Sequence, residues 1–305
     1  MVRDLSKNNE LILEARNLTK QFKVSKSSTL TACDNINLST YKGKTLGIVG
    51  ESGCGKSTFL RMLMNLEKIS SGEIFYKGKD ISKFSKDEIW ESRQHIQMVY
   101  QDPGASFNPR MKVVDILTEP LINYDRLKKE DKEKKAIELL EMVDLPADFI
   151  HKYPQNMSGG QRQRLGIARA ISLEPEILIC DEATSALDVS IQKNIVELLV
   201  KLQKEKNITM IFICHDIALI ESFAHEIVVM VIHHTLIGKR HAQVEFNAHF
   251  QDGAETAYHH ELSTFVNIDG YWYFIDPTAP LPTMKQACIC GSGKKFKACC
   301  GQFFK

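Results

Sequence analysis

The sequence has no long hydrophobic run and almost no net charge. Its longest apolar stretches, such as IVVMVI ending at Ile232, are far shorter than the ~20 residues of a membrane-spanning helix. Lys and Arg number 39 against 38 Asp and Glu, a formal net charge of +1, so nothing in the charge points to nucleic acid. The first residues, MVRDLSKNNELILEARN, mix both charge signs and do not form a secretory signal. We therefore expect a cytoplasmic protein.

Eight cysteines are present, and they fall into two groups. In a reducing compartment, scattered cysteines are usually small buried hydrophobes, and we expect this of Cys33, Cys54, Cys180 and Cys214. The other four, discussed below, cluster near the C-terminus.

Short apolar runs recur along the first three quarters of the chain, with helical patterns between them. The runs do not alternate with polar residues, which is typical of strands covered on both faces. We therefore predict an α/β fold with a mainly parallel sheet, its strands at 45–49, 96–100, 176–180, 208–214 and 226–230. A charged insert, DRLKKEDKEKKAIELLEMVDLP, predicts a helix ended by Pro146, with a solvated face.

The pattern changes after Arg240. HAQVEFNAHF, HHELSTFVNI and YWYFIDP alternate apolar and polar residues, and QDG and IDG are turn signals. This pattern predicts a small antiparallel sheet, and therefore a second domain.

A glycine-rich segment, GIVGESGCGKST, follows the first predicted parallel strand and precedes a helix. The spacing of Gly50 and Gly55-Lys56-Ser57 is that of a phosphate-binding P-loop in its required context. Its backbone N–H groups and the helix N-terminus favour phosphate; Lys56 would contact the β- and γ-phosphates, and Ser57 would hold Mg²⁺. We expect the nucleotide to lie against Gly50, Glu51, Ser52, Gly53, Cys54, Gly55, Lys56, Ser57 and Thr58.

An acidic pair follows the predicted strand 176–180, in ILICDEATSALD. In P-loop proteins an Asp at this place coordinates Mg²⁺, and a following Glu can polarise the attacking water. We therefore predict Asp181 as a magnesium ligand and Glu182 as the catalytic base. Upstream, Ser158-Gly159-Gly160 in NMSGGQRQRLGIARA precedes a helix and offers either a second anion-binding terminus or a simple helix cap.

Together, GESGCGKST, MSGGQ, ILICDE, SALD and the His of ICHD resemble the ATP-binding cassette (ABC) ATPases over about residues 11–230. The resemblance implies that two cassettes, identical or different, dimerise head-to-tail around two ATP molecules. It further implies that His215 contacts the γ-phosphate, that Asp188 lies at the dimer interface, and that the partner's ATP is closed by Ser158, Gly159, Gly160 and Gln161. Phe22 occupies the place of an aromatic that stacks on adenine, with packing in the core as the alternative.

The segment YQDPGASFNPRMKVVDILTEPL resembles the peptide and nickel importer subgroup in particular. Gln101 matches the Q-loop, which implies a catalytic and Mg²⁺-binding role and communication with integral-membrane permease subunits. Met157 stands where this family usually has Leu. The resemblance implies a location on the inner face of the cell membrane.

The C-terminal run CICGSGKKFKACC contains two pairs of cysteines with eight residues between the pairs. Four thiolates suit tetrahedral zinc, and the run is similar to the SEC-C motif, so we expect Zn²⁺ at Cys288, Cys290, Cys299 and Cys300; free or disulfide-linked thiols are the alternative. The preceding segment resembles the last strands of an NTF2-like sheet found in small bacterial SEC-C proteins.

We therefore expect a cassette at residues 1–230, a junction at 231–240, a partial antiparallel sheet at 241–284 and a zinc motif at 285–305. The function favoured is ATP hydrolysis in an importer of peptides or nickel, with no specific nucleic acid as partner. Two alternatives stay open: a soluble, non-transport ABC ATPase that uses its zinc tail as an adaptor, and a non-functional fusion of two truncated genes.

Overall fold

The computed structural model describes residues 9–24, 29–50, 53–184, 187–214, 216–230, 235–237, 241–252, 255–268, 271–274, 283, 285–286, 288 and 294–300. The chain divides into two compact units, one of residues 1–50 and 55–229, the other of residues 51–54 and 230–305.

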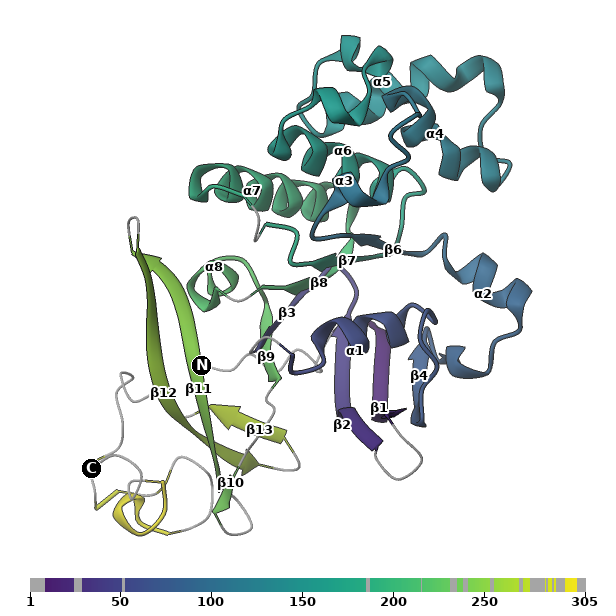
Figure 1. Ribbon diagram of the computed structural model, residues 1–305. Coiled ribbons are helices and arrows are strands. Elements are labelled where there is room, and N and C mark those ends of the chain that lie inside the picture. Colours follow the sequence, from purple (N-terminus) through teal and green to yellow (C-terminus); the bar gives the residue numbers. More distant parts are fainter. Residues whose placement is uncertain are drawn as a thin grey trace. The chain divides into compact units, whose positions relative to one another are not determined.

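A five-stranded sheet forms the centre of the larger unit (Figure 1). Its spatial order is β6 (Ile96–Val99), β7 (Ile177–Asp181), β8 (Thr209–Ile213), β3 (Thr45–Gly50) and β9 (Glu226–Met230). The pairs β6–β7, β7–β8 and β8–β3 are parallel. β8 is buried at every position, as expected for an unalternated apolar run between two layers. The α/β fold with a mainly parallel sheet is confirmed.

A second sheet in this unit was not predicted. β2 (Thr29–Tyr41), β1 (Leu11–Lys23), β4 (Ser71–Tyr76) and β5 (Lys79–Asp80) lie side by side in that order, with antiparallel pairing. β1 buries Leu13, Ala15 and Leu18, but register shifts with both neighbours interrupt its alternation. Those irregularities hide the two-residue period that would have marked it as a strand.

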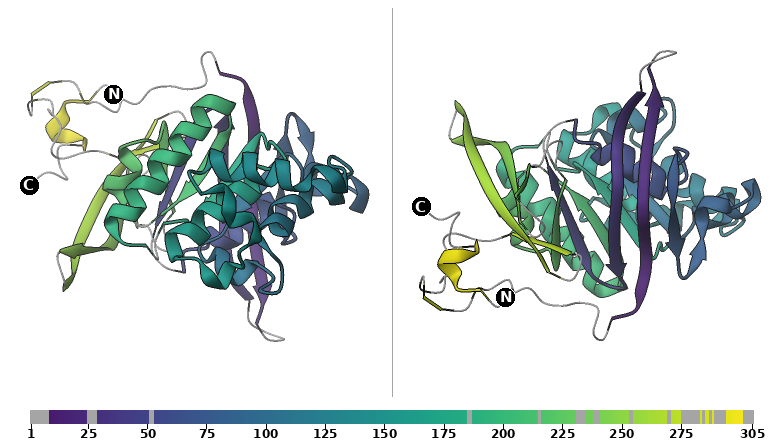
Figure 2. Two further views of the ribbon diagram at one scale, coloured as in Figure 1. Left: turned by 90° about the horizontal axis from the view of Figure 1, so that it is seen from above. Right: turned by 90° about the horizontal axis from the view of Figure 1, so that it is seen from below.

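In Figure 2 the teal helices of the larger unit lie in front in the view from above, and the purple strands lie in front in the view from below. Five of the helices form this cluster. They are α3 (Pro103–Ser106), α4 (Val113–Asn123), α5 (Lys132–Met142), α6 (Gly159–Ile171) and α7 (Val189–Lys206). Three other helices lie next to strands in the sequence: α1 (Lys56–Leu63) follows β3, α2 (Lys86–Ser92) precedes β6, and α8 (Ile217–Glu221) precedes β9. Short 3-10 helices cover Ile81–Lys83, Lys129–Asp131, Ala147–His151, Pro154–Asn156 and, in the smaller unit, Phe296–Ala298.

One continuous core joins the sheet to these helices. Leu178 and Phe212 from the strands share it with Leu139 of α5, Leu165 of α6 and Leu199 of α7. The sheet and the helical cluster therefore support each other, and a Phe212→Ala change would cost about 3–5 kcal/mol of stability.

The predicted charged helix is shorter than expected at both ends. α5 begins at Lys132, and it ends at Met142, before Pro146 is reached. Asp144 takes a left-handed φ of 53°, and the Leu145 N–H donates to the Leu140 carbonyl, which closes the last turn. A left-handed Asp replaces the Gly that usually signals such an ending.

The smaller unit contains the predicted antiparallel sheet. Its order is β10 (Thr235–Ile237), β11 (His241–Asp252), β12 (Glu255–Ile268) and β13 (Tyr271–Phe274). β11 and β12 pair from His241↔Val266 to Asp252↔Glu255 without a register shift. The alternation after Arg240 thus predicted both strand type and pairing.

Candidate functional site

Three of the predicted site residues, Gly50, Gln101 and Asp181, lie at one edge of the parallel sheet. Because β3, β6, β7 and β8 run in the same direction, their carboxyl ends meet there. Gly50 ends β3 and Asp181 ends β7, while Gln101 follows β6 by two residues and is exposed. His215 follows β8 but lies outside the described residues, as do Glu51 and Ser52.

The glycine-rich loop ends at Gly55, which caps the N-terminus of α1 with a left-handed φ of 96°. A Cβ there would lie 2.1 Å from the Ala32 carbonyl oxygen of β2, so only glycine fits. The Phe59 N–H donates to the Gly55 carbonyl in the first helical hydrogen bond. Because the first N–H groups of a helix have no acceptor within the helix itself, the start of α1 is suited to phosphate oxygens.

Lys56, the first residue of α1, is buried, with only 5% of its surface exposed. Its Nζ donates to the Gly50 carbonyl oxygen at 2.6 Å. The side chain is therefore folded along the loop it belongs to, and its ammonium group lies where a phosphate chain held by the loop would place negative charge.

Ser57 and Asp181 meet although 124 residues separate them in sequence. The Ser57 hydroxyl hydrogen-bonds to the Asp181 carboxyl group. Burial raises the pKa of Asp181 and the charge of Glu182 raises it further, while Ser57 and Lys56 act in the opposite direction. One hydroxyl and one carboxylate at the edge of a phosphate loop are oxygen ligands of the kind Mg²⁺ prefers, so the residues present fit the ion.

Glu182 has an unusual backbone. Its φ of 48° is left-handed, which is costly for a residue with a long side chain. The Glu182 N–H donates to the Ile213 carbonyl at the end of β8, at 3.1 Å, and this bond holds the turn. A residue kept in such a conformation next to a magnesium-binding pair is consistent with a catalytic role.

The SGGQ segment forms the start of α6. Ser158 and Gln161 make a capping box: the Ser158 side chain accepts from the Gln161 N–H, and the Gln161 side chain accepts from the Ser158 N–H. A Cβ on Gly160 would lie 2.9 Å from Cγ2 of Ile191 in α7. Ser158, Gly159 and Asp188 are exposed, so they remain accessible to a partner.

Phe22 lies on β1, half-buried. Two residues before it, Lys20 is 8% exposed, and its Nζ lies 4.6 Å from the centroid of the Phe22 ring. Lys20 pairs with Cys33 across β1 and β2, and Cys33 contacts the carbonyl of Gly55 at 3.6 Å. Phe22 therefore lies on the strand whose neighbour, β2, contacts the end of the phosphate loop. The sequence reasoning missed Lys20, because a single lysine in a strand carries no signal.

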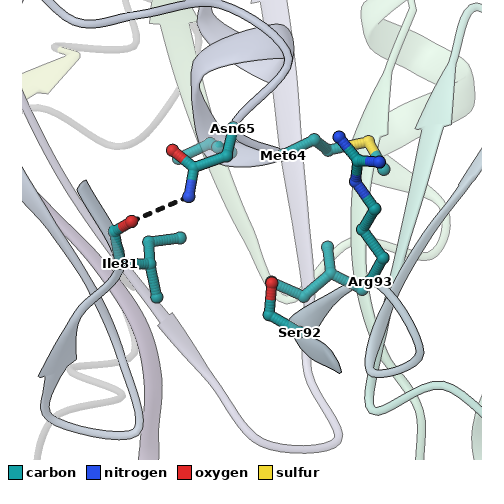
Figure 3. A pocket seen from close by; sticks show the side chains of 7 residues that line it. Met64, Asn65, Ile81, Ser92 and Arg93 are labelled. Atoms are coloured by element: carbon teal, nitrogen blue, oxygen red, sulfur yellow. Dashed lines mark hydrogen bonds between the residues drawn. The ribbon is translucent and has the colours of Figure 1, made fainter. Parts of the chain in front are cut away.

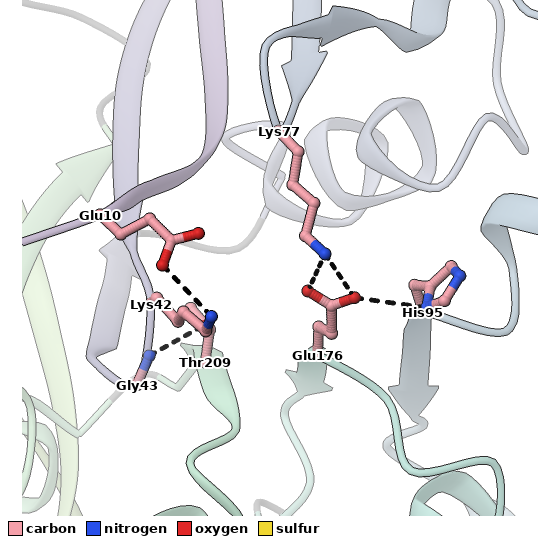
Figure 4. A network of polar contacts seen from close by, with 7 residues as sticks. All are labelled: Glu10, Lys42, Gly43, Lys77, His95, Glu176 and Thr209. Carbon is pink, nitrogen blue, oxygen red and sulfur yellow. Dashed lines mark hydrogen bonds and ion pairs between the residues drawn. The ribbon is translucent and has the colours of Figure 1, made fainter.

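At the opposite edge of the same sheet, a polar network joins the two sheets (Figure 4). Glu176, just before β7, binds Lys77 at 2.6 Å and faces His95, just before β6, at 3.4 Å. The network also includes the pair Lys42–Glu10 and a hydrogen bond from Gly43 to Thr209. This network is structural, because it lies at the amino ends of the strands, away from the phosphate loop.

A small hollow lies beside α1, lined by Leu63, Met64, Asn65, Ile81, Ser92, Arg93 and Ile96 (Figure 3). Its enclosed volume of about 10 Å³ holds no more than one water molecule. The Asn65 side chain donates across it to the Ile81 carbonyl at 2.7 Å. The hollow is therefore too small for a nucleotide.

In the smaller unit, the sulfur atoms of Cys288, Cys299 and Cys300 lie within 4.8 Å of one another, and all three residues are buried. A tetrahedral zinc ion, with Zn–S distances near 2.3 Å, spaces its sulfurs about 3.8 Å apart. The N–H of Cys288 donates to the Lys294 carbonyl and that of Phe296 to the Gln286 carbonyl, which folds the two cysteine segments together. The three sulfur atoms are therefore suitable zinc ligands. The predicted fourth ligand, Cys290, lies outside the described residues.

A parallel sheet with a phosphate loop after one strand and a magnesium-type acidic pair after another, joined to a helical cluster that begins with SGGQ, defines an ATP-binding cassette. Residues 33–185 match the ABC transporter family model. The chain belongs to the ABC transporter family. Residues 217–277 match the middle NTF2-like domain of YchJ, and residues 284–302 match the SEC-C motif.

Relatives agree with this assignment. The chain is 46% identical over 209 residues to the oligopeptide transport ATP-binding protein OppF of Salmonella typhimurium, covering 68% of this chain and 63% of that protein. It is 44% identical to OppF of Haemophilus influenzae, covering 75% and 71%. The chain thus spans less than two thirds of the Salmonella protein.

Among solved structures, a dimeric ATP-binding cassette in a post-hydrolysis state, bound to ADP and Pi, is 31% identical. The TM-score is 0.65, and the match covers 72% of this chain and 94% of that one. None of the helices in the described ranges combines the length and the apolarity that a membrane crossing requires.

Proposed function

We propose that this chain binds MgATP and hydrolyses it as the ATPase subunit of an oligopeptide importer. The observation that carries the proposal is the meeting of Ser57 with Asp181 beside the buried ammonium of Lys56. Peptide is favoured over nickel as cargo because the relatives are named oligopeptide transport ATP-binding proteins.

Each residue has a role in this proposal. The amides of the loop from Gly50 to Thr58 and the ammonium of Lys56 hold the phosphates, while Ser57, Asp181 and Gln101 hold Mg²⁺, which neutralises charge on the phosphate oxygens. Glu182 orients and deprotonates the attacking water, and His215 contacts the γ-phosphate. Phe22 stacks on the adenine.

A second cassette, identical or different, completes the site. The exposed positions of Ser158, Gly159 and Asp188 support a head-to-tail dimer in which SGGQ closes on the partner's ATP. Closure and opening of this dimer would move integral-membrane permease subunits, with the chain held peripherally on the inner face of the membrane. The cassette in this proposal covers residues 1–230, followed by a junction at 231–240 and a partial sheet at 241–284.

We also propose that residues 285–305 bind one zinc ion through Cys288, Cys290, Cys299 and Cys300. The spacing of the three described sulfur atoms supports it. The ion would serve to fold this segment, since four thiolates leave no open coordination position for catalysis.

ATP hydrolysis by the purified chain tests the main proposal. Lys56→Ala should abolish ATP binding, while Glu182→Gln should retain binding and lower kcat at least about 100-fold. Lys77→Met, at the opposite edge of the sheet, is the control and should hydrolyse ATP like the parent. Full activity in both Lys56→Ala and Glu182→Gln would overturn the proposal.

A further inference from the structure

A buried lysine ties the Phe22 ring to the phosphate-loop helix. Lys20 Nζ donates to Glu67 Oε1 at 2.6 Å and to the Lys68 carbonyl at 2.7 Å. Glu67 and Lys68 follow α1 within the turn that ends it, and the Glu67 N–H donates to the carbonyl of Arg61 in α1. The ammonium group therefore joins β1 to the helix that begins at the phosphate loop.

The same ammonium group contacts the Phe22 ring, 4.6 Å from its centroid. Lys20 and Phe22 are two residues apart on β1, and their contact shows that the two side chains lie together there. A cation over an aromatic ring is attracted by the electrons of that face, and the attraction is stronger where water is excluded. Lys20 is 8% exposed, so the contact is largely desolvated.

A buried ammonium is costly unless its donors are satisfied. Here Glu67 supplies the counter-charge, and the hydrogen bond from Lys20 lowers the pKa of Glu67, which keeps it ionised. With a carboxylate, a carbonyl and an aromatic face around it, the Lys20 ammonium is held in one place. The contact with this fixed ammonium group in turn restrains the Phe22 ring.

We propose that Lys20 is a positioning residue for purine binding: it occupies one face of Phe22 and fixes the ring relative to the phosphate loop, so that the other face is presented to the adenine. The inference rests on the proposed role of Phe22 as the adenine platform. The inference also predicts that loss of Lys20 weakens only ligands with a purine base, because a ligand without a base contacts the phosphate loop but not the Phe22 ring.

The experiment compares ATP with inorganic tripolyphosphate, both with Mg²⁺, by isothermal titration calorimetry. Lys20→Met keeps most of the side-chain length and removes the charge. We expect the ATP Kd to rise about three- to tenfold and the tripolyphosphate Kd to stay within twofold of the parent. Lys20→Arg retains a cation that can contact the ring and Glu67, and should recover most of the ATP affinity.

Lys77→Met is the matched control. Lys77 also pairs with a glutamate, Glu176, and lies 5.6 Å from the ring of Tyr76, but at the far edge of the sheet. Its loss removes the same kinds of interaction and should leave both Kd values unchanged. A rise in both Kd values for Lys20→Met would show a merely structural role and overturn the inference.

Phe22→Ala separates this inference from the proposal beneath it. If Phe22→Ala raises the ATP Kd and Lys20→Met adds nothing in that background, Lys20 acts through the ring, as inferred. If Phe22→Ala raises the ATP Kd while Lys20→Met alone has no effect, the inference fails and the platform stands. An unchanged ATP Kd in Phe22→Ala would remove the platform, and the role of Lys20 with it.

Discussion

Gly166 of α6 packs directly against Pro103 of α3: a Cβ built on Gly166 would lie 2.9 Å from the Pro103 Cβ. Pro103 follows Gln101 by two residues, and α6 begins with the SGGQ segment. The segment that follows Gln101 therefore touches the helix that is proposed to close on the partner's ATP.

Filling this contact should destabilise the protein according to the size of the new side chain. We expect Gly166→Ala to lose stability despite a gain of about 1 kcal/mol in helix preference, because its Cβ would lie 2.9 Å from the rigid ring of Pro103, which must shift. Gly166→Val should cost about 1–3 kcal/mol by overpacking. Urea denaturation measures both, and a Gly166→Val protein as stable as the parent would show that the two helices separate freely.

Gly55→Ala should damage the nucleotide site more than its backbone strain alone explains. The new Cβ would meet the Ala32 carbonyl at 2.1 Å, so the loop must move. Gly78→Ala is the control: Gly78 has a similar φ of 75° with nothing within 4 Å of its Cβ position. We expect Gly78→Ala to lose about 1–3 kcal/mol of stability with normal ATP affinity, and Gly55→Ala to lose ATP binding. Equal ATP affinity in the two variants would contradict the steric account.

The Glu176 network should make stability depend on pH in the acid range. Partial burial on its own raises the pKa of Glu176, but the hydrogen bond and charge of Lys77, with a smaller effect of His95, lower it overall. A carboxylate whose folded-state pKa lies below its unfolded value near 4.3 contributes stability above that value, and this contribution is lost as pH falls through the folded pKa.

Glu176→Gln should therefore be less stable than the parent at pH 7 by about 0.5–1 kcal/mol, the range of a partly exposed ion pair. The difference should hold down to about pH 5 and narrow below about pH 4.3. Lys77→Met removes the partner of Glu176, and its stability difference from the parent should narrow with falling pH in the same way. Urea midpoints at pH 7, 5 and 4 measure this, and a difference that stays constant at every pH would rule the network out as the cause.

The zinc proposal can be tested by metal analysis of the whole chain. We expect about one zinc per chain, and a loss of most of it in Cys288→Ser and Cys299→Ser. Cys180→Ala, which changes a buried cysteine of the cassette, should keep its zinc. Equal zinc in the parent and in both serine variants would eliminate the site.

The sequence predicted the parallel sheet well because its strands are buried on both faces and carry unbroken apolar runs. Thr45–Gly50 and Glu226–Met230 lie within one residue of the predicted bounds. The phosphate loop could also be recognised from the sequence, because its chemistry needs glycines at fixed places. What these segments share is that local sequence alone determines them.

The features that escaped prediction depend on partners distant in sequence. The buried ammonium group of Lys20 is stabilised by Glu67 and by the Phe22 ring. Glu67 is 47 residues away in sequence, so the residues next to Lys20 do not predict this partner. The register shifts of β1 arise from its two neighbouring strands. The end of α5 at a left-handed Asp144 replaces the expected signal from Pro146. Ser57 and Asp181 were each expected as magnesium ligands, because each belongs to a sequence motif.

ATP-dependent association of Glu182→Gln tests the central claim most directly. With hydrolysis blocked, saturating MgATP should double the molar mass measured by light scattering, since two cassettes close around two nucleotides. Adding Lys56→Ala to this variant removes phosphate binding and should keep the chain monomeric. We expect a dimer with MgATP and a monomer without it; a Glu182→Gln protein that stays monomeric at saturating MgATP would contradict the proposed ATPase mechanism.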